Sequence, residues 1–322
     1  MKQIFVTVAL LAAVVLAAAD TALFKYAPND STGAVEVDVL PLLKHPRVAE
    51  ALNKPEYVKT RQEWESKTGI RLQDFKKVVF FVNASGKGIV LLNVDKNLDL
   101  EKFFSQNQVK FQKLTVAGKT ILRVMDPVKN NKTAELAVLA PGVIIAGEKG
   151  DIARYLNAPR GNARALQALV QKIPAGFSMW TAFVNTFPNP QGQVEDPRQL
   201  YFAFRFAGKE QRDLNFSLKL FCNDANGAQA LSAMLPMYAN MGLAMVFSSD
   251  LKLGNELVML LKPVVEENTV LADVTISAEL VEKIAVYFEK NAKKFVKKQK
   301  AAAKKRVPAK KSGTQAAGTE KR

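Results

Sequence analysis

The sequence predicts an α+β protein with mainly antiparallel sheets and helices packed on one face. Three observations support this prediction. Apolar and polar residues alternate along many short segments, these segments come in pairs joined by short turns, and helical patterns separate the pairs. The chain has 322 residues, of which 48% are hydrophobic and 24% charged, a composition typical of globular proteins. Such a chain is long enough to bury a sizeable core.

The N-terminus has the three-part pattern of a secretory signal peptide. Lys2 supplies a positive charge, an uncharged apolar run extends from Ile4 to Leu16, and small residues follow it up to Ala19. The run is short for a bilayer span. We therefore expect cleavage after Ala19 and export to the periplasm or the outside of the cell. Retention of residues 1–19 as an N-terminal anchor is the alternative.

The first α+β unit is expected at 20–173 and begins with a strand and a helix. In "GAVEVDVL", Val35 and Val37 alternate with Glu36 and Asp38, which predicts a strand whose acidic side faces water. A helical pattern then runs from Pro55 to Thr68 and ends at a glycine.

The rest of this unit is predicted to be mostly hairpins. "KKVVFFVN" and "KGIVLLNV" flank "ASG" and are apolar on both faces, so we expect a central, covered hairpin. "LDLEKFFSQ" predicts a short helix. Three strands follow, at Val109–Leu114, Lys119–Met125 and Thr133–Leu139. "PGVIIAGEKGDIARYL" then predicts a turn, a strand and a helix.

A second unit is expected at 174–290, in a similar order of elements. "SMWTAFVN" predicts a strand, "LYFAFRFAGKEQRDLNFSLKLFCN" a hairpin, and a helix begins near Asn226. "VVEENTVLADVTIS" predicts another hairpin before the helix of "AELVEKIAVYF". The shared order suggests internal duplication, with the two copies joined at Pro174 to Gly176.

This layout, together with "VIIAGEKGDIARYL", resembles uncharacterised exported bacterial proteins built from duplicated α+β units. The resemblance covers most of the chain after the signal peptide. That family has no assigned activity, so the resemblance implies the fold and export only.

The positive charge is concentrated at the C-terminus. The formal net charge is +16, and from Lys290 onward thirteen Lys or Arg face one Glu, a net +12. We expect a Lys-rich tail at 291–322 that is helical up to Pro308 and disordered beyond it. The residues predicted to bind a polyanion are Lys293, Lys294, Lys297, Lys298, Lys300, Lys304, Lys305, Arg306, Lys310 and Lys311.

The composition of the Lys-rich tail indicates the kind of partner to expect. Lys is a mobile point charge that suits diffuse polyanions, so we expect docking on an anionic envelope polymer or an anionic membrane surface. A nucleic-acid-binding protein is the alternative, because "AAAKKRVPAKK" has the composition of a linker-histone tail. A solvated tail that only aids solubility is the simplest explanation.

No catalytic, metal-binding or cofactor-binding constellation is evident in the sequence. His45 is the single histidine and Cys222 the single cysteine, so neither has the clustered partners of a zinc site or a triad. "AGKT" lacks the upstream glycine of a phosphate-binding loop and predicts a hairpin turn. Two carboxylate pairs, Glu36 with Asp38 and Glu266 with Glu267, have no visible sugar platform. We predict a non-enzymatic protein; a hydrolase with an unrecognised acidic site stays open.

Four methionines repeat at helical spacing: Met234, Met237, Met241 and Met245. Such a stripe usually packs in a core, but it can also form an adaptable apolar groove. Pro236 is expected to kink or interrupt this helix.

Overall fold

The computed structural model describes residues 21–68, 71–95, 98–106, 108–125, 133–161, 163–184, 198–208, 210 and 212–305. The chain divides into two compact units, one ending at Ala278 and one beginning at Glu279. The predicted signal peptide, at 1–19, lies outside the described residues.

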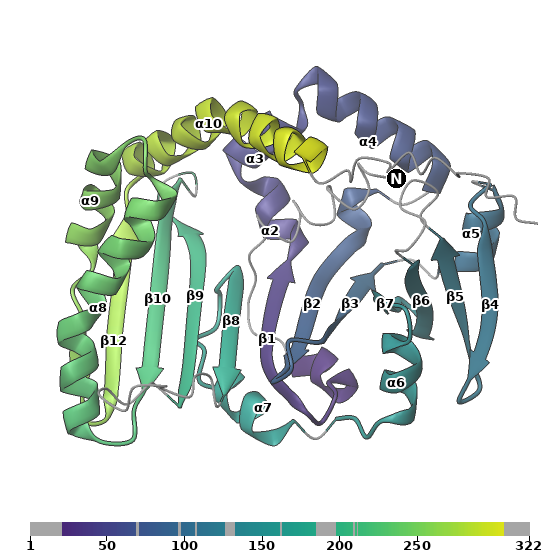
Figure 1. The fold of residues 1–322 in the computed structure, drawn as a ribbon, viewed down its shortest axis with the longest axis horizontal. Coiled ribbons are helices and arrows are strands. Elements are labelled where there is room, and N and C mark those ends of the chain that lie inside the picture. The colour runs from purple at the N-terminus through teal and green to yellow at the C-terminus, as the bar shows by residue number, and fades with distance from the viewer. Residues whose placement is uncertain are drawn as a thin grey trace, which may run out of the picture. The chain divides into compact units, whose positions relative to one another are not determined.

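The described strands of the first unit form one sheet of twelve, in the order β11-β12-β10-β9-β8-β1-β2-β3-β7-β6-β5-β4 (Figure 1). Every described strand pair is antiparallel. The strands are β1 (Ser31–Asp38), β2 (Phe75–Asn83), β3 (Gly88–Val94), β4 (Phe111–Val116), β5 (Lys119–Met125), β6 (Thr133–Ala140), β7 (Val143–Glu148), β8 (Met179–Val184), β9 (Gln199–Ala207), β10 (Asp213–Phe221), β11 (Val264–Glu266) and β12 (Thr269–Ile276). The predicted α+β class and antiparallel sheet are confirmed.

Most helices are short and connect the strands. They are η1 (Thr21–Tyr26), α2 (Val39–Lys44), α3 (Pro46–Leu52), α4 (Pro55–Thr68), η2 (Leu72–Asp74), α5 (Leu100–Gln106), α6 (Asp151–Asn157), α7 (Arg164–Val170), α8 (Ala225–Val246), α9 (Leu251–Leu260) and α10 (Ala278–Lys305). The helix predicted from Pro55 to Thr68 is α4.

The largest core lies on the face of the sheet that η1, α6 and α7 cover. Its centre is Trp180 of β8, which is fully buried and stacks on Phe24 of η1 with ring centroids 6.1 Å apart. Phe24 also meets Phe81 of β2 edge-on. Ile152 of α6 and Leu166 of α7 close this core from outside the sheet.

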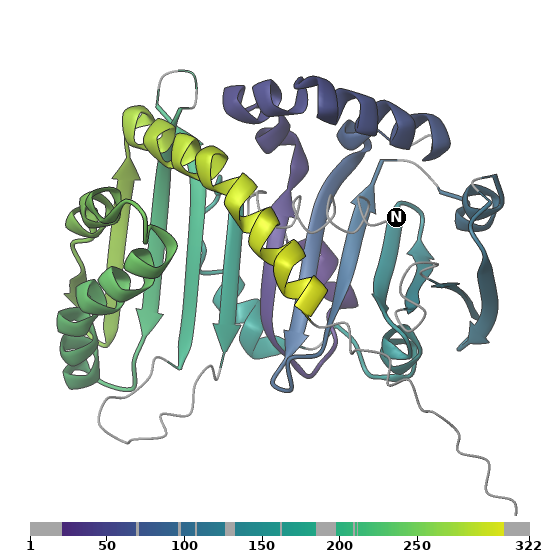
Figure 2. The ribbon, with the colours of Figure 1, turned by 45° about the horizontal axis from the view of Figure 1, so that its top comes forward.

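Other helices cover the opposite face of the sheet. Leu42 of α2 packs with Val37 and Val78, whose neighbours along each strand point into the first core. Ala228 and Leu231 of α8 pack on the same face, and Figure 2 shows α8 and α9 in front of the sheet. The helices therefore lie on both faces, not on one as predicted, because a broad sheet with apolar residues on both sides needs two covers.

The sheet is continuous across the predicted boundary at residue 174. β1 pairs with β8 along a register that includes Val35 opposite Thr181, so strands from the two halves are hydrogen-bonded neighbours. The similar order of elements is present in both halves, but duplication itself is not confirmed.

The prediction that Glu36 faces water is wrong. Its side chain is fully buried, and its Oε1 accepts a hydrogen bond from Lys77 Nζ at 3.2 Å. β1 lies between β2 and β8 and is covered on both faces, so alternation along it does not mark a wet side. A buried carboxylate needs such a cation to offset its lost hydration.

A similar ion pair joins β5 and β6, nearer the β4 edge of the sheet. Glu135 of β6 is fully buried, and its Oε1 accepts two hydrogen bonds from Arg123, from Nε at 2.9 Å and from Nη2 at 2.7 Å. Its Oε2 accepts a third from the backbone N–H of Gly150 at 3.0 Å. These bonds fix β5, β6 and the start of α6 relative to one another.

The second unit is described as far as Lys305 and consists of α10. Glu279 and Lys283 form an ion pair at 3.1 Å along one helix face, and the rings of Tyr287 and Phe288 meet edge-on. The predicted closing helix and its extension into the basic segment are therefore one helix.

Candidate functional site

Helix α8 begins with a side-chain cap and packs one face on the sheet. Asp224 accepts a hydrogen bond from the backbone N–H of Gly227 at 2.8 Å, which satisfies a free donor at the helix start. The inner residues Ala228, Leu231 and Leu235 contact Leu220 and other apolar side chains of the sheet. This packing sets which side of α8 turns outward.

The predicted methionine stripe lies on α8, and most of it is exposed. Met234 is half-buried, whereas Met237, Met241 and Met245 are 51%, 55% and 76% exposed. The helix is continuous past Pro236 to Val246, so Pro236 does not interrupt it, and a kink there stays a prediction. Packing against the sheet and against α9 outweighs the hydrogen bond that proline cannot make.

Helix α9 extends this apolar surface. Asp250 caps it by accepting from the backbone N–H of Leu253 at 3.1 Å. Gly254 lies against α8, where an added Cβ would come within 3.6 Å of the Leu243 carbonyl oxygen. On its outer side, Leu251 and Met259 are 57% and 76% exposed.

We call five residues the methionine face: Met237, Met241 and Met245 of α8 with Leu251 and Met259 of α9. Sequence reasoning missed the α9 members. Their eight-residue separation, two helical turns, was the available signal.

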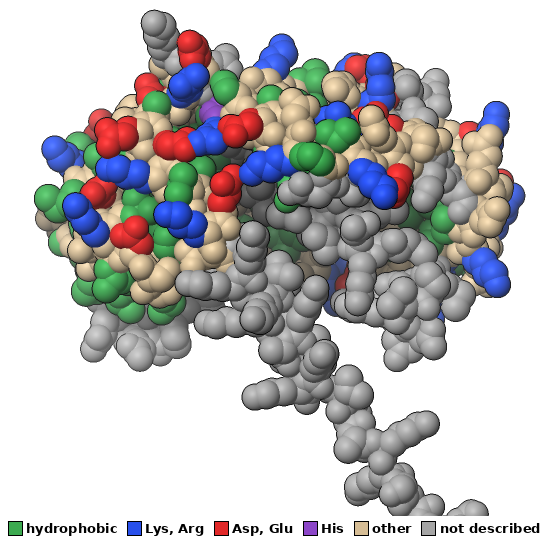
Figure 3. All heavy atoms as spheres, turned by 90° about the horizontal axis from the view of Figure 1, so that it is seen from above, with side chains coloured by type: hydrophobic (Ala, Val, Ile, Leu, Met, Phe, Trp, Pro, Cys, Tyr) green, Lys and Arg blue, Asp and Glu red, His purple; other side chains and the backbone are tan. Residues whose placement is uncertain are grey.

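The methionine face has few charges near it. The 22 residues of α8 include no Asp, Glu, Lys or Arg, and α9 contains only Lys252 and Glu256. In Figure 3 hydrophobic side chains gather at the lower left, where α8 and α9 lie, while basic and acidic side chains interleave elsewhere on that face. No surface of one sign is visible there among the described side chains.

The predicted polyanion-binding residues are only partly covered by the structure. The backbone from Lys293 to Lys305 belongs to α10, but these side chains lie outside the described part. Arg306, Lys310 and Lys311 lie wholly outside it.

His45 is a buried residue between α2 and α3. Its ring stacks on Phe206 with centroids 3.9 Å apart, and among the described residues neither ring nitrogen has a hydrogen-bond partner. Burial lowers its pKa from 6.5, and the positive charges of Arg212 and Arg47 lower it further. A neutral ring on an aromatic neighbour, with no described group to exchange a proton with, fits a structural role.

The two carboxylate pairs are not arranged as catalytic pairs. Glu36 is paired with Lys77 in the core, whereas Asp38 ends β1 and is half-buried. Glu266 and Glu267 are exposed at the turn between β11 and β12. Among the described residues, no three His, Cys, Asp or Glu side chains could hold a metal ion.

Cys222 is buried beside Leu220 and Val270, and as the single cysteine of the chain it forms no disulfide within it. This position agrees with the interpretation of Cys222 as a small core residue. Among the described helices, none combines the length and hydropathy needed to cross a bilayer.

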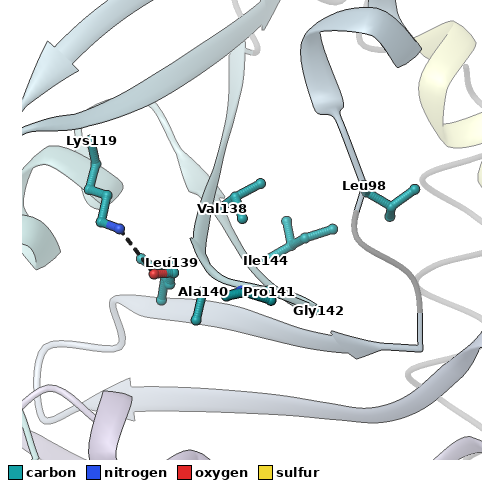
Figure 4. Close-up of a pocket in the computed structure, with 8 residues that line it drawn as sticks. All are labelled: Leu98, Lys119, Val138, Leu139, Ala140, Pro141, Gly142 and Ile144. Carbon is teal, nitrogen blue, oxygen red and sulfur yellow. Dashed lines mark hydrogen bonds between the residues drawn. The ribbon is translucent and has the colours of Figure 1, made fainter.

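A hollow of about 310 Å³ lies at the turn between β6 and β7 (Figure 4). Its lining is almost wholly apolar, and the Lys119 ammonium beside it donates to the Leu139 carbonyl oxygen at 3.1 Å. Lys119 belongs to "AGKT", where Ala117 and Gly118 have positive φ values of 48° and 71° and form the turn between β4 and β5. The segment is therefore a hairpin turn, as predicted, and the Lys119 ammonium that lines the hollow is bound to a backbone carbonyl of the same wall.

Comparisons with known proteins give no family. No family model matches the chain, and no curated protein matches it. A solved structure of a protein named TP0453, in its crystal form I, is similar at a TM-score of 0.40 and 12% identity. The match covers 82% of this chain and 96% of TP0453. A likeness of this strength supports no conclusion about function.

Proposed function

We propose that this is an exported, non-enzymatic binding protein that docks through its Lys-rich C-terminal tail on an anionic surface of the cell envelope. The observation that supports this most is the separation of charge. Net +12 of the total +16 lies from Lys290 onward, which leaves +4 for the much longer body. A basic segment of this kind attracts anionic polymers and membranes without help from the fold.

Two structural observations support a separate docking arm. The segment from Glu279 onward forms its own compact unit, and α10 is a single helix of 28 residues, about 42 Å long. On such a helix the sequence spacing of Lys293, Lys297 and Lys300 predicts that they share one side. Near an anionic lipid surface each Lys is worth about 1 kcal/mol.

The test is retention on isolated envelope material at low salt. We expect a variant lacking residues 293–322 to lose retention, and a variant with Lys→Gln at the ten predicted residues, Arg306 included, to lose it too. Replacing the nine lysines by Arg is the matched control: it keeps the charge and should keep retention. Unchanged retention of the Gln variant would overturn the proposal.

Cell fractionation separates this proposal from the nucleic-acid alternative. An exported protein is recovered without residues 1–19 and with the envelope. Recovery of the unprocessed chain with nucleic acid would favour the alternative, whose binding would weaken with salt at a slope near −0.9 per phosphate neutralised.

A further inference from the structure

The methionine face is unusual because its five residues are large, apolar and exposed, although α8 has a buried inner side. The inner side of α8 already packs on the sheet through Ala228 and Leu231. The exposure of Met241 and Met245 is therefore not needed to hold α8 in place. Large apolar side chains that lie exposed on two neighbouring helices are typical of a surface that binds a protein or a membrane.

The chemistry of the side chains narrows the choice of partner. Methionine is unbranched and adaptable, and it can fill an irregular apolar environment without a fixed complementary shape. A hydrated anionic polymer offers charge but no apolar interior. A lipid bilayer offers both, and a lipid surface needs no lock-and-key fit.

The charges around the face are compatible with lipid headgroups. Lys252 is exposed next to Leu251, and Lys262 is exposed just after α9, whereas Glu256, the acidic residue within α9, is half-buried. Asp250 is engaged with its own helix as the cap of α9. Long lysine stems can lie along an apolar surface while the ammonium stays among headgroups.

Stable peripheral attachment generally needs two signals, such as a polybasic segment and an apolar insertion. The chain carries both, in different elements: the basic tail and the methionine face. We therefore propose that the methionine face of α8 and α9 inserts into the outer layer of an anionic lipid membrane to which the tail has drawn the protein. This inference rests on the proposed function and selects membrane over polymer as the anionic surface.

Binding to vesicles and to a soluble polyanion tests the two steps separately. The variant is Met241→Gln with Met245→Gln, because Gln has nearly the size of Met and adds polarity but no charge. On vesicles of phosphatidylglycerol and phosphatidylcholine we expect its dissociation constant to rise about tenfold. Its binding to soluble polyphosphate should not change, because that ligand has no apolar interior.

Two matched controls accompany this variant. The parent and every variant are prepared with the N-terminus that the protein has when it is isolated from cells. Met241→Leu with Met245→Leu keeps the face apolar and should bind vesicles as the parent does. Tyr57→Gln removes an exposed apolar side chain of α4, outside the face, and should leave vesicle binding unchanged. Thermal unfolding confirms that each variant is folded.

A direct readout of insertion is Met245→Trp. We expect its fluorescence to shift to the blue on anionic vesicles and to be quenched by brominated lipid chains. Emission that stays unshifted and unquenched on bound vesicles would overturn the inference.

The outcomes distinguish the two proposals. Equal vesicle affinity of the Gln variant and the parent overturns insertion, even if loss of the tail charges abolishes binding. Unchanged binding after loss of the tail charges overturns the proposed function. If the parent is a dimer and the Gln variant a monomer, the methionine face is instead an interface between copies of the chain, which also overturns insertion.

Discussion

The centre of the sheet buries a charged residue, whereas the end of the sheet that α8 and α9 cover leaves large apolar residues exposed. At the centre, Glu36 is fully buried against Lys77. At the α8–α9 end, Met245 and Met259 are mostly exposed although their side chains are apolar. The centre thus accepts a desolvated charge to complete a two-sided core, whereas the end leaves apolar surface uncovered. We therefore expect the centre to contribute more to stability than the α8–α9 end, which we propose as a binding surface.

The sharpest test of this contrast is a pair of truncations. Trp180→Ala opens a cavity in the central core, and we expect the free energy of unfolding to fall by about 4 kcal/mol. Met245→Ala removes a large side chain from the methionine face, and we expect a change within about 0.5 kcal/mol. Urea denaturation of both variants measures the difference. Comparable losses would show that the α8–α9 end is as tightly packed as the centre.

Removing one partner of a buried ion pair should be the next largest effect. We expect Glu135→Gln to cost about 3 kcal/mol, because Arg123 keeps its charge without a full partner. The control is Glu101→Gln, which disrupts the exposed pair with Lys113 and should cost less than about 1 kcal/mol. A loss at Glu135 no larger than at Glu101 would remove the buried pair from the account of stability.

The free energy of unfolding should depend on pH through His45, which is buried between α2 and α3. Its pKa is lowered from 6.5 in the folded protein, so protons bind more readily to the unfolded chain. This contribution to stability is fully present above pH 6.5 and is lost as the pH falls below it toward the folded-state pKa.

His45→Leu tests this dependence, since the chain has no other histidine. Thermal unfolding between pH 7.5 and 5 should show a fall in stability for the parent that is smaller in the variant. Identical pH profiles would mean that the His45 ring is accessible to protons without cost.

The smallest expected effect lies on the methionine face itself. The double variant Met241→Gln and Met245→Gln should leave the free energy of unfolding within about 0.5 kcal/mol of the parent. Denaturant midpoints check this. A clear loss of stability would mean that these side chains support the fold and are not a free surface.

The sequence predicted elements better than it predicted their surroundings. The helix at Pro55 to Thr68 and the strand at Lys119 to Met125 match the structure in full, because caps, turns and periodicity are local signals. The wet side assigned to Glu36 failed because alternation reports a period of two and not which strands flank it. β1 became central through pairing with β8, about 145 residues away in the chain.

The same limit applies to the candidate site. Helical spacing identified Met234, Met237, Met241 and Met245 as one stripe, but it could not show whether the stripe faces the sheet or the outside. That choice is made by Ala228 and Leu231, which dock on β10 and β12. The α9 members of the face became apparent only when α9 was placed beside α8.

The central claim is that a nearly neutral body carries a separate cationic arm for attachment. The most direct measurement is the salt dependence of binding to anionic vesicles, for the parent and for the variant with Gln at the ten basic tail positions. We predict tight binding of the parent that weakens steeply with salt, and binding of the variant that is at least about a hundredfold weaker at low salt and nearly independent of salt. Equal affinity and equal salt dependence in the two proteins would contradict the claim.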